Sequence, residues 1–275
     1  MKQSSAHPGR LRNLCVSVAV SLTAMCMPGL ARTAAAQTGS IPPPPDINVG
    51  SGSDGPDFLF GRPDGWVGLR AGWLVARAGS DWYDFVSDQL TIDDGAFNTA
   101  DLSADVGITI SSRLDAVAGV AFTRARVASE YRRLVDTNRL PINQETRLRT
   151  VNVTGSAKVA LRNRGREVSR LAWVPHTLVP FVGAGGGALH YLLQQSGDFV
   201  DFRNSRVFPS TFQSTAWTPS AHVFGGVDIR VLRRTFVTID ARYRWASGRL
   251  GSTWVDFDPI DLSGFQLSAG MDLVF

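Results

Sequence analysis

The chain has 275 residues, with 28 Lys and Arg residues against 24 Asp and Glu residues and a hydrophobic share of 44%. Four basic residues and no acidic residue fall within positions 1–36, so the rest of the chain is formally neutral. A neutral chain lacks the basic surface that binds nucleic acid, which excludes nucleic acid as an expected partner. The remaining length suits one β domain.

The first 36 residues have the composition of a cleavable signal peptide. Lys2 begins a basic segment, Leu14–Met27 is a short apolar run, and Ala34–Ala36 is a small-residue cleavage site. The apolar run is shorter than a membrane-spanning helix needs. An uncleaved anchor helix is the alternative interpretation of this segment.

Both cysteines, Cys15 and Cys26, lie in this expected signal peptide. The mature chain therefore has no disulfide, no thiol nucleophile and no cysteine-ligated zinc, and we expect no cofactor or metal. A cysteine-free exported chain fits the periplasm or the outer membrane. Residues 37–65 are rich in Pro and Gly and predict a periplasmic lead-in.

From residue 66 onward, apolar and polar residues alternate in eight segments. A period of two indicates strands that have one apolar face and one polar face. The segments are 67–75, 102–110, 114–122, 151–161, 181–193, 221–229, 237–245 and 265–275. A soluble β-sandwich also alternates and is the main alternative fold.

The links between these segments alternate in length. We expect short turns at 111–113 and 231–235 and long loops at 78–98, 132–143, 198–214 and 248–260. Short periplasmic turns and long extracellular loops are typical of outer-membrane barrels. The segment 162–178 is too long for this rule. The pattern predicts an all-β fold over residues 66–275, an eight-stranded antiparallel up-and-down transmembrane β-barrel.

The C-terminal strand carries the most specific pattern. Leu267, Ala269, Met271 and Leu273 alternate up to Phe275. The chain resembles the small bacterial outer-membrane barrel proteins, such as the OmpA membrane domain, OmpX and OmpW. This resemblance implies an outer-membrane location among outer-membrane lipids. It also implies that Phe275 is part of the signal read by the barrel-assembly machinery.

The faces opposite the apolar faces carry the charges expected inside the barrel. Five acidic and five basic residues make up this set: Asp105, Asp115, Asp228, Asp240, Asp272, Arg70, Lys158, Arg230, Arg242 and Arg244. An eight-stranded barrel is just wide enough for side chains to fill it, and buried charges must be paired. We therefore expect a closed, salt-bridged interior, with Arg70 paired to Asp272 where strands one and eight meet. A narrow channel is the alternative.

Ser220 and His222 form one candidate site. They face the same way, as in lipid A deacylases of the PagL type. Here they fall on the interior face, with Arg244 about opposite, and no Glu lies near. We therefore interpret His222 as a hydrogen-bonded interior residue.

Four outward arginines, Arg124, Arg126, Arg147 and Arg149, lie just beyond the apolar faces of the third and fourth strands. Pairing the two strands from their periplasmic ends puts Arg126 opposite Arg149 and Arg124 opposite Val151. Like charges in neighbouring strands repel, whereas guanidinium groups match phosphates, so we predict an anion site for lipopolysaccharide. A solvated face neutralised by Glu130 and Glu145 is the alternative.

The sequence favours a non-enzymatic outer-membrane barrel with a structural or surface-binding role. A small-solute channel or transporter of the OmpW type is the second hypothesis. A lipid A-modifying enzyme is the third.

Overall fold

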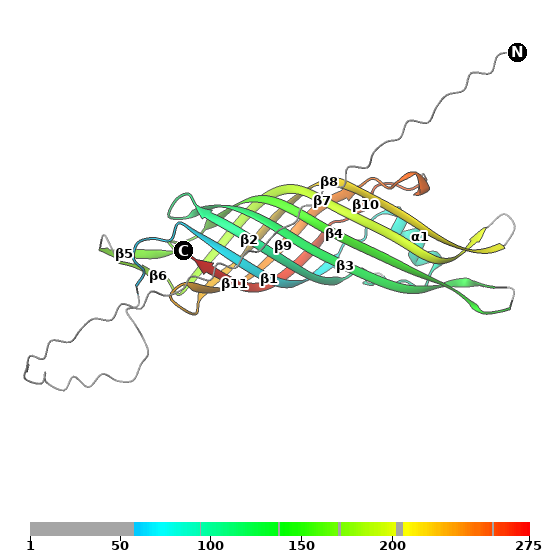
Figure 1. The fold of residues 1–275 in the computed structure, drawn as a ribbon, viewed down its shortest axis with the longest axis horizontal. Coiled ribbons are helices and arrows are strands. Elements are labelled where there is room, and N and C mark those ends of the chain that lie inside the picture. Colours follow the sequence, from blue (N-terminus) through cyan, green and yellow to red (C-terminus); the bar gives the residue numbers. More distant parts are fainter. Residues whose placement is uncertain (1–57, 94, 137, 170–171, 202–205, 255) are drawn as a thin grey trace, which may run out of the picture. The chain divides into compact units, whose positions relative to one another are not determined.

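Eight antiparallel strands form a closed ring in the computed structural model, which describes residues 58–275 except 94, 137, 170–171, 202–205 and 255. The ring consists of β1 (Gly65–Ala76), β2 (Thr99–Thr109), β3 (Leu114–Val135), β4 (Pro141–Ala160), β7 (Leu178–Asp201), β8 (Arg206–Arg230), β9 (Thr235–Gly248) and β11 (Gly264–Val274). β11 pairs with β1 and closes the ring (Figure 1). The predicted all-β, eight-stranded antiparallel barrel is confirmed. The expected signal peptide and residues 37–57 of the lead-in lie outside the described residues.

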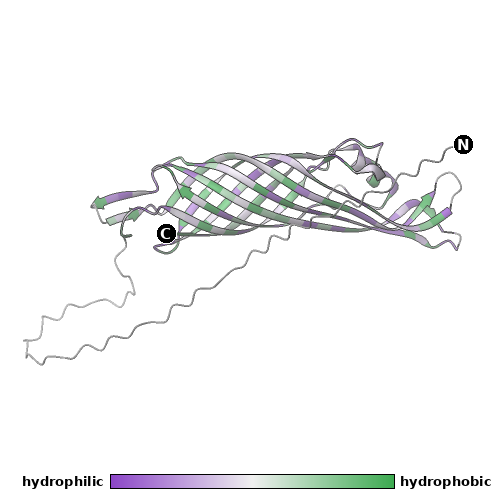
Figure 2. Cartoon of the chain, turned by 45° about the horizontal axis from the view of Figure 1, so that its top comes forward, coloured by the Kyte–Doolittle hydropathy of each residue, from purple (hydrophilic) through white to green (hydrophobic). Residues whose placement is uncertain are grey.

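The two faces of each barrel strand differ as the alternation predicts. Leu69 and Ile108 point outward and are 72% and 64% exposed, whereas the neighbouring inward residues Arg70 and Asp105 are buried. Figure 2 shows hydrophobic and hydrophilic residues in turn along the strands. The barrel is therefore apolar outside and polar inside, the reverse of a soluble domain.

Four strands are much longer than predicted. β3, β4, β7 and β8 contain 22, 20, 24 and 25 residues and continue past the rim as two hairpins (Figure 1). The expected long loops at 132–143 and 198–214 are thus mostly strand, which corrects that prediction. Polar residues on both faces, such as Arg132 and Arg133, hide the period of two there. We call this end of the barrel the long-hairpin end.

The other two expected long loops fold into the barrel mouth. They contain α1 (Asp81–Gln89), η1 (Ser252–Trp254) and β10 (Ile260–Asp261). Trp82 of α1 is fully buried, and its ring centre lies 6.0 Å from that of Trp254 and 5.9 Å from that of Phe97. These rings pack against inward residues of the long strands, including Tyr191 and Leu193. We call this apolar cap the plug, and it is formed by the two long loops predicted at 78–98 and 248–260.

The opposite end, which we call the short-turn end, carries the turns at 111–113 and 231–234. The unexplained segment 162–178 forms a hairpin there, from β5 (Gly165–Ser169) and β6 (Ala172–Pro175). Trp173 of this hairpin exchanges two backbone hydrogen bonds with Leu59. No helix within the described ranges is long and apolar enough to cross a membrane.

Candidate functional site

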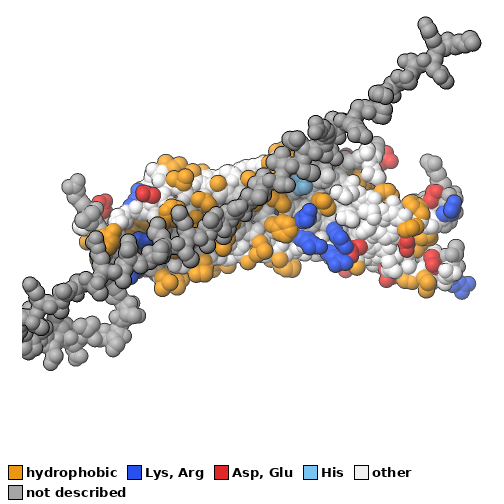
Figure 3. Space-filling model, viewed as in Figure 1, with side chains coloured by type: hydrophobic (Ala, Val, Ile, Leu, Met, Phe, Trp, Pro, Cys, Tyr) orange, Lys and Arg blue, Asp and Glu red, His pale blue; other side chains and the backbone are white. Residues whose placement is uncertain are grey.

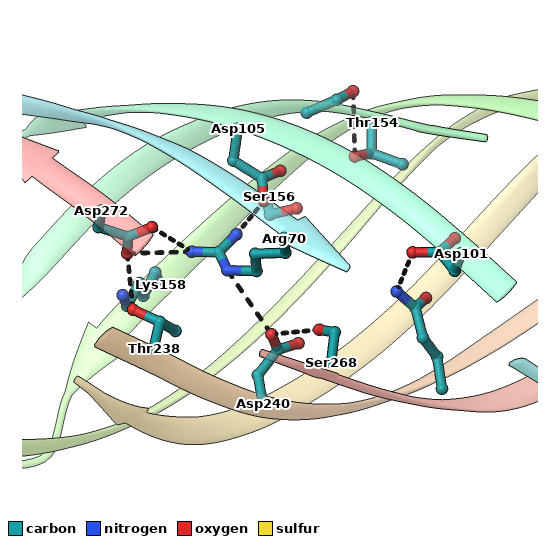
Figure 4. Close-up of polar contacts among 12 residues, drawn as sticks. Arg70, Asp101, Asp105, Thr154, Ser156, Lys158, Thr238, Asp240, Ser268 and Asp272 are labelled. Atoms are coloured by element: carbon teal, nitrogen blue, oxygen red, sulfur yellow. Dashed lines mark hydrogen bonds and ion pairs between the residues drawn. The ribbon is translucent and has the colours of Figure 1, made fainter. Parts of the chain in front are cut away.

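Arg70 is the centre of a buried charge cluster inside the barrel. Its guanidinium donates to Asp105 on β2 and lies 3.0 Å from Asp272 on β11 (Figure 4). Its Nε is 3.6 Å from Asp240 on β9. The predicted pair of Arg70 and Asp272 is therefore present at the seam between the first and last strands. All four side chains are buried, so Arg70 takes the place of water beside the three carboxylates.

A second group of charges lies nearer the short-turn end. Lys158 Nζ donates to both carboxylate oxygens of Asp228, at 3.0 and 2.8 Å. Asp115 accepts from Trp66 Nε1 at 2.9 Å and from Arg164 Nη1 at 2.5 Å. Arg164 precedes the β5–β6 hairpin, so this hairpin sends a charged side chain back into the barrel. Sequence reasoning missed Arg164 because it lies outside the alternating segments.

A third layer lies toward the plug and is held mainly by neutral partners. Gln266 Nε2 donates to Asp101 at 2.6 Å, and Arg244 donates to the backbone carbonyl of Leu262 at 3.2 and 3.3 Å. Asp101 also has inward parity but was not included in the predicted set. The Nε atom of Arg242 is buried without a hydrogen-bond partner among the described residues.

The predicted set of interior charges therefore lies on the inner face of the barrel wall. Arg70, Asp105, Asp115, Lys158, Asp240, Arg244 and Asp272 are buried, and Asp228, Arg230 and Arg242 are half-buried. No three His, Cys, Asp or Glu side chains within the described ranges are placed to hold a metal ion.

Side chains leave little space between these layers. The cavity beside Arg70 and Asp240 has a volume of about 10 Å³, and that beside Arg244 about 20 Å³. The cavity at the short-turn end, lined by Trp66 and Asp115, has about 50 Å³. A cavity of this kind needs about 10–15 Å³ to hold one water, so the two inner spaces are about that size and the third is a few times larger.

Ser220 and His222 both face the interior but bond to different residues of β4. Ser220 Oγ donates to Asn152 Oδ1 at 2.8 Å, and His222 Nε2 lies 2.9 Å from Ser156 Oγ. His222 is opposite Arg244, as the register predicted. The Ser220 and His222 side chains are 7% and 2% exposed, so a substrate on the outer wall cannot reach them.

The four outward arginines, which we call the arginine belt, lie on β3 and β4 just past the apolar band. Arg124 is opposite Arg149, and Arg126 is opposite Arg147. The predicted register was wrong by two residues, because β4 ends at Ala160 and Leu161 hydrogen-bonds to Pro180 of β7 instead. Figure 3 shows basic side chains gathered beyond the apolar side chains on one face.

Glu145 neutralises only part of the arginine belt. It accepts from Arg126 Nε at 2.7 Å and also from Arg147, and these hydrogen bonds lower the pKa of Glu145. The side chains of Arg124 and Arg149 make no hydrogen bond or ion pair with the described residues. Two guanidinium groups thus face each other across neighbouring strands without a counterion from the part of the chain that the structure describes.

Comparison with known proteins gives similarity in structure alone. No protein-family model matches the sequence, and none of the curated sequences matches it significantly. The structure of Neisserial surface protein A is similar over 77% of this chain and 97% of that chain, at 14% identity and a TM-score of 0.43. The structure of Ail, the attachment invasion locus protein of Yersinia pestis, is similar over 77% and 99%, at 14% identity and a TM-score of 0.41.

A third similar structure is the N-terminal β-barrel domain of Pseudomonas aeruginosa OprF. The similarity covers 78% of this chain and 98% of that domain, at 10% identity and a TM-score of 0.34. The fold of the present chain follows from its own closed ring of eight antiparallel strands. The chain is an up-and-down β-barrel similar to the small outer-membrane barrel proteins.

Proposed function

We propose that this protein is an integral barrel of the bacterial outer membrane, with a closed interior and a structural or surface-binding role. The reversed polarity of the wall supports this most directly. Large apolar side chains such as Leu69, Ile108 and Leu267 are more than half exposed, while Arg70 and Asp272 are buried. In water such an outer wall is unfavourable, but in hydrocarbon it is the favourable arrangement.

The height of the apolar band supports the same proposal. On β3 the outward apolar residues run from Leu114 to Phe122, which is nine residues. A tilted transmembrane strand needs about 9–11 residues. Trp73 and Trp245 lie near the long-hairpin ends of β1 and β9 and point outward. Tryptophan is enriched where a bilayer meets water.

The interior argues for a closed barrel over a solute channel. Buried ion pairs around Arg70 and Lys158 fill the half nearer the short-turn end, and the plug fills the other half. The buried positions of Ser220 and His222 argue against lipid A chemistry. We therefore assign the protein no enzymatic role and place its contacts with partners on the outer wall and the hairpins.

Membrane fractionation, gel mobility and conductance test this proposal together. We expect the protein in the outer-membrane fraction, with a mobility that changes on boiling because the closed barrel resists detergent. In planar bilayers we expect no steady conductance from the purified, folded protein. Recovery from the soluble periplasm would overturn the location. Stable channel openings would overturn the closed interior and favour the solute channel.

The arginine belt is the part of the outer wall that we propose as a binding site. We propose that Arg124 and Arg149 bind a phosphate of lipopolysaccharide in the outer leaflet. Two uncompensated guanidinium groups lie just beyond Phe122, where the apolar band ends. Guanidinium forks bind phosphate oxygens bidentately, and an anion between them relieves the repulsion between like charges.

The double substitution R124Q/R149Q tests the phosphate site, with R133Q/R139Q on the distant β3–β4 hairpin as the matched control. Both double variants remove two exposed positive charges. We expect purified lipopolysaccharide to raise the unfolding temperature of the wild type and of R133Q/R139Q. The effect should be largely lost in R124Q/R149Q. An unchanged effect in R124Q/R149Q would make the arginine belt an ordinary solvated face.

A further inference from the structure

A second set of arginines encircles the opposite end of the barrel. Every described connection at the short-turn end carries at least one arginine. Apart from Arg164, which pairs with Asp115 inside the barrel, they are Arg62 before β1, Arg113 between β2 and β3, Arg162 and Arg166 between β4 and β6, and Arg233 and Arg234 between β8 and β9. We call these residues the arginine collar. Among the described residues of these connections only Asp64 and Glu167 are acidic, so the collar is basic.

Five collar arginines, Arg62, Arg113, Arg162, Arg166 and Arg234, form no ion pair with the described residues. Arg113 Nε donates to the side-chain oxygen of Asn163 at 2.8 Å, and Arg62 donates to the backbone carbonyl of Ser111. Arg162 Nη2 lies 3.3 Å from the Nδ1 atom of His176. The oxygens of Asn163 and Ser111 carry no formal charge, so they orient Arg113 and Arg62 without cancelling the charge of these guanidinium groups.

Backbone hydrogen bonds make the collar one continuous surface. Arg230 N donates to Thr177 O at 2.8 Å, which joins the β8–β9 turn to the β4–β7 connection. Val274 N donates to Arg234 O at 2.9 Å, which joins the same turn to the end of β11. The collar arginines are therefore held at one rim of the wall, although they are spread over 173 positions of the sequence from Arg62 to Arg234.

Exposed apolar side chains stand beside the arginines in the same connections. Val231 and Leu232 directly precede Arg233 and Arg234, and Leu161 directly precedes Arg162. Val231, Leu232 and Leu161 are each more than half exposed. An apolar residue next to a basic residue suits the boundary between hydrocarbon and headgroups, because one enters the chains and the other reaches the phosphates.

We propose that the arginine collar binds the headgroups of anionic phospholipids in the periplasm-facing leaflet. This inference rests on the proposed membrane barrel, because it places the short-turn end at that leaflet. The guanidinium groups supply the phosphate contacts. The exposed Val231, Leu232 and Leu161 give a lipid, with its acyl chains, the advantage over a free phosphate or a soluble polyanion. The collar is separated from the arginine belt by the whole apolar band, so each serves its own leaflet.

The test compares lipids retained by the folded protein. The wild type is reconstituted in vesicles of equal parts phosphatidylglycerol and phosphatidylcholine, released in mild detergent and analysed by native mass spectrometry. The test variant is R113Q/R166Q/R234Q, which removes one charge from each of three connections. The control is R133Q/R139Q/R249Q, which removes three exposed charges at the long-hairpin end. Gel mobility before and after boiling reports folding in every sample.

We expect the wild type and the control to retain several-fold more phosphatidylglycerol than phosphatidylcholine, and the test variant to lose this preference. A wild type without preference, or a control that loses it equally, would overturn the collar while leaving the membrane barrel intact. Failure of the wild type to fold into either lipid would instead overturn the barrel proposal. Binding to peptidoglycan sacculi that depends on the collar, without lipid preference, would assign the collar to the cell wall and also overturn the inference.

Discussion

Arg70 and Asp272 join the first and last strands of the barrel, with 3.0 Å between the guanidinium and the carboxylate. Arg70 is also the shared partner of Asp105 and Asp240, so its removal leaves three buried carboxylates without their cation. Removing one partner of a buried pair costs about 3–5 kcal/mol. We predict that R70M lowers the free energy of unfolding by about this amount. Urea unfolding in vesicles measures it.

The matched comparison for R70M is D272N. In this variant Arg70 keeps Asp105 and Asp240, so we expect the loss of stability to be clearly smaller than for R70M. Equal losses in the two variants would contradict a cluster that depends on Arg70. A stable R70M barrel would show that the three carboxylates are protonated or hydrated when the arginine is absent.

The plug depends on Trp82, the fully buried ring of α1. Replacing a buried Trp by Ala costs about 3–5 kcal/mol, and here the loss falls on the contacts of α1 with Trp254 and Phe97. We predict that W82A makes the segment 78–98 sensitive to added protease. Because α1 is not part of the barrel wall, the gel mobility of W82A before boiling should stay that of the folded barrel. Loss of the folded band would mean that the plug supports the barrel itself.

The buried phenol of Tyr83 should make the plug less stable at alkaline pH. Its hydroxyl donates to the backbone carbonyl of Asp261 at 3.1 Å, and burial raises the pKa of this phenol above its ordinary value. The unfolded plug loses the Tyr83 proton near pH 10, whereas the folded plug keeps it. The stabilisation by this raised pKa is therefore complete below about pH 10 and is lost as the pH rises further.

We predict that protease sensitivity of residues 78–98 rises above about pH 10 in the wild type, from the ordinary pKa of tyrosine. Y83F has no proton to lose at this position. Its sensitivity should therefore change little between pH 9 and 11, even if the lost hydrogen bond makes the plug weaker at every pH. The same alkaline rise in both proteins would assign it to another group.

Alternation along the chain was sufficient to predict the wall of the barrel. One face of each strand meets an apolar environment and the other a polar one, so residues such as Leu69 and Arg70 differ sharply. The pairing of Arg70 with Asp272 followed from closure, since the first and last strands must be neighbours. Both predictions follow from the alternation of side chains along a strand and from closure of the barrel. Neither requires the packing of individual side chains to be known.

Beyond the apolar band the same reasoning fails. The hairpin extensions carry polar residues on both faces, so nothing in the sequence separates a strand from a loop at 132–143. The plug depends on contacts between Trp82 and Trp254, which are far apart in sequence. The register of the arginine belt was off by two because β4 ends before Leu161, a detail that only the backbone hydrogen bonds define.

Phe275 allows assembly to be separated from stability. Its backbone N–H donates to Gly65 O at 3.0 Å, while its ring is 59% exposed and adds little to the folded barrel. We predict that F275A refolds in vesicles with an unfolding temperature close to the wild type. In cells we expect a clearly lower amount in the outer membrane, because the barrel-assembly machinery loses the aromatic ring. Normal cellular amounts would show that the ring is not part of an assembly signal.

Glu145 binds the two arginines, Arg126 and Arg147, that form one half of the arginine belt. Its carboxylate is an internal competitor for any phosphate at that position. We predict that E145Q releases both arginines and tightens lipopolysaccharide binding by a few-fold at most, since an exposed charge pair is weak. The measurement is the concentration of lipopolysaccharide that gives half of the rise in unfolding temperature.

The control for E145Q is E130Q, which removes an exposed acidic residue farther along β3 whose side chain does not contact the arginine belt in the hydrogen bonds and ion pairs of the described residues. Both variants raise the net charge by one, so a general electrostatic attraction to lipopolysaccharide would strengthen binding equally in both. Tighter binding in E145Q alone would show that the gain comes from the two released guanidinium groups. Weaker binding in E145Q would mean that Glu145 holds the arginines in the orientation that the phosphate needs.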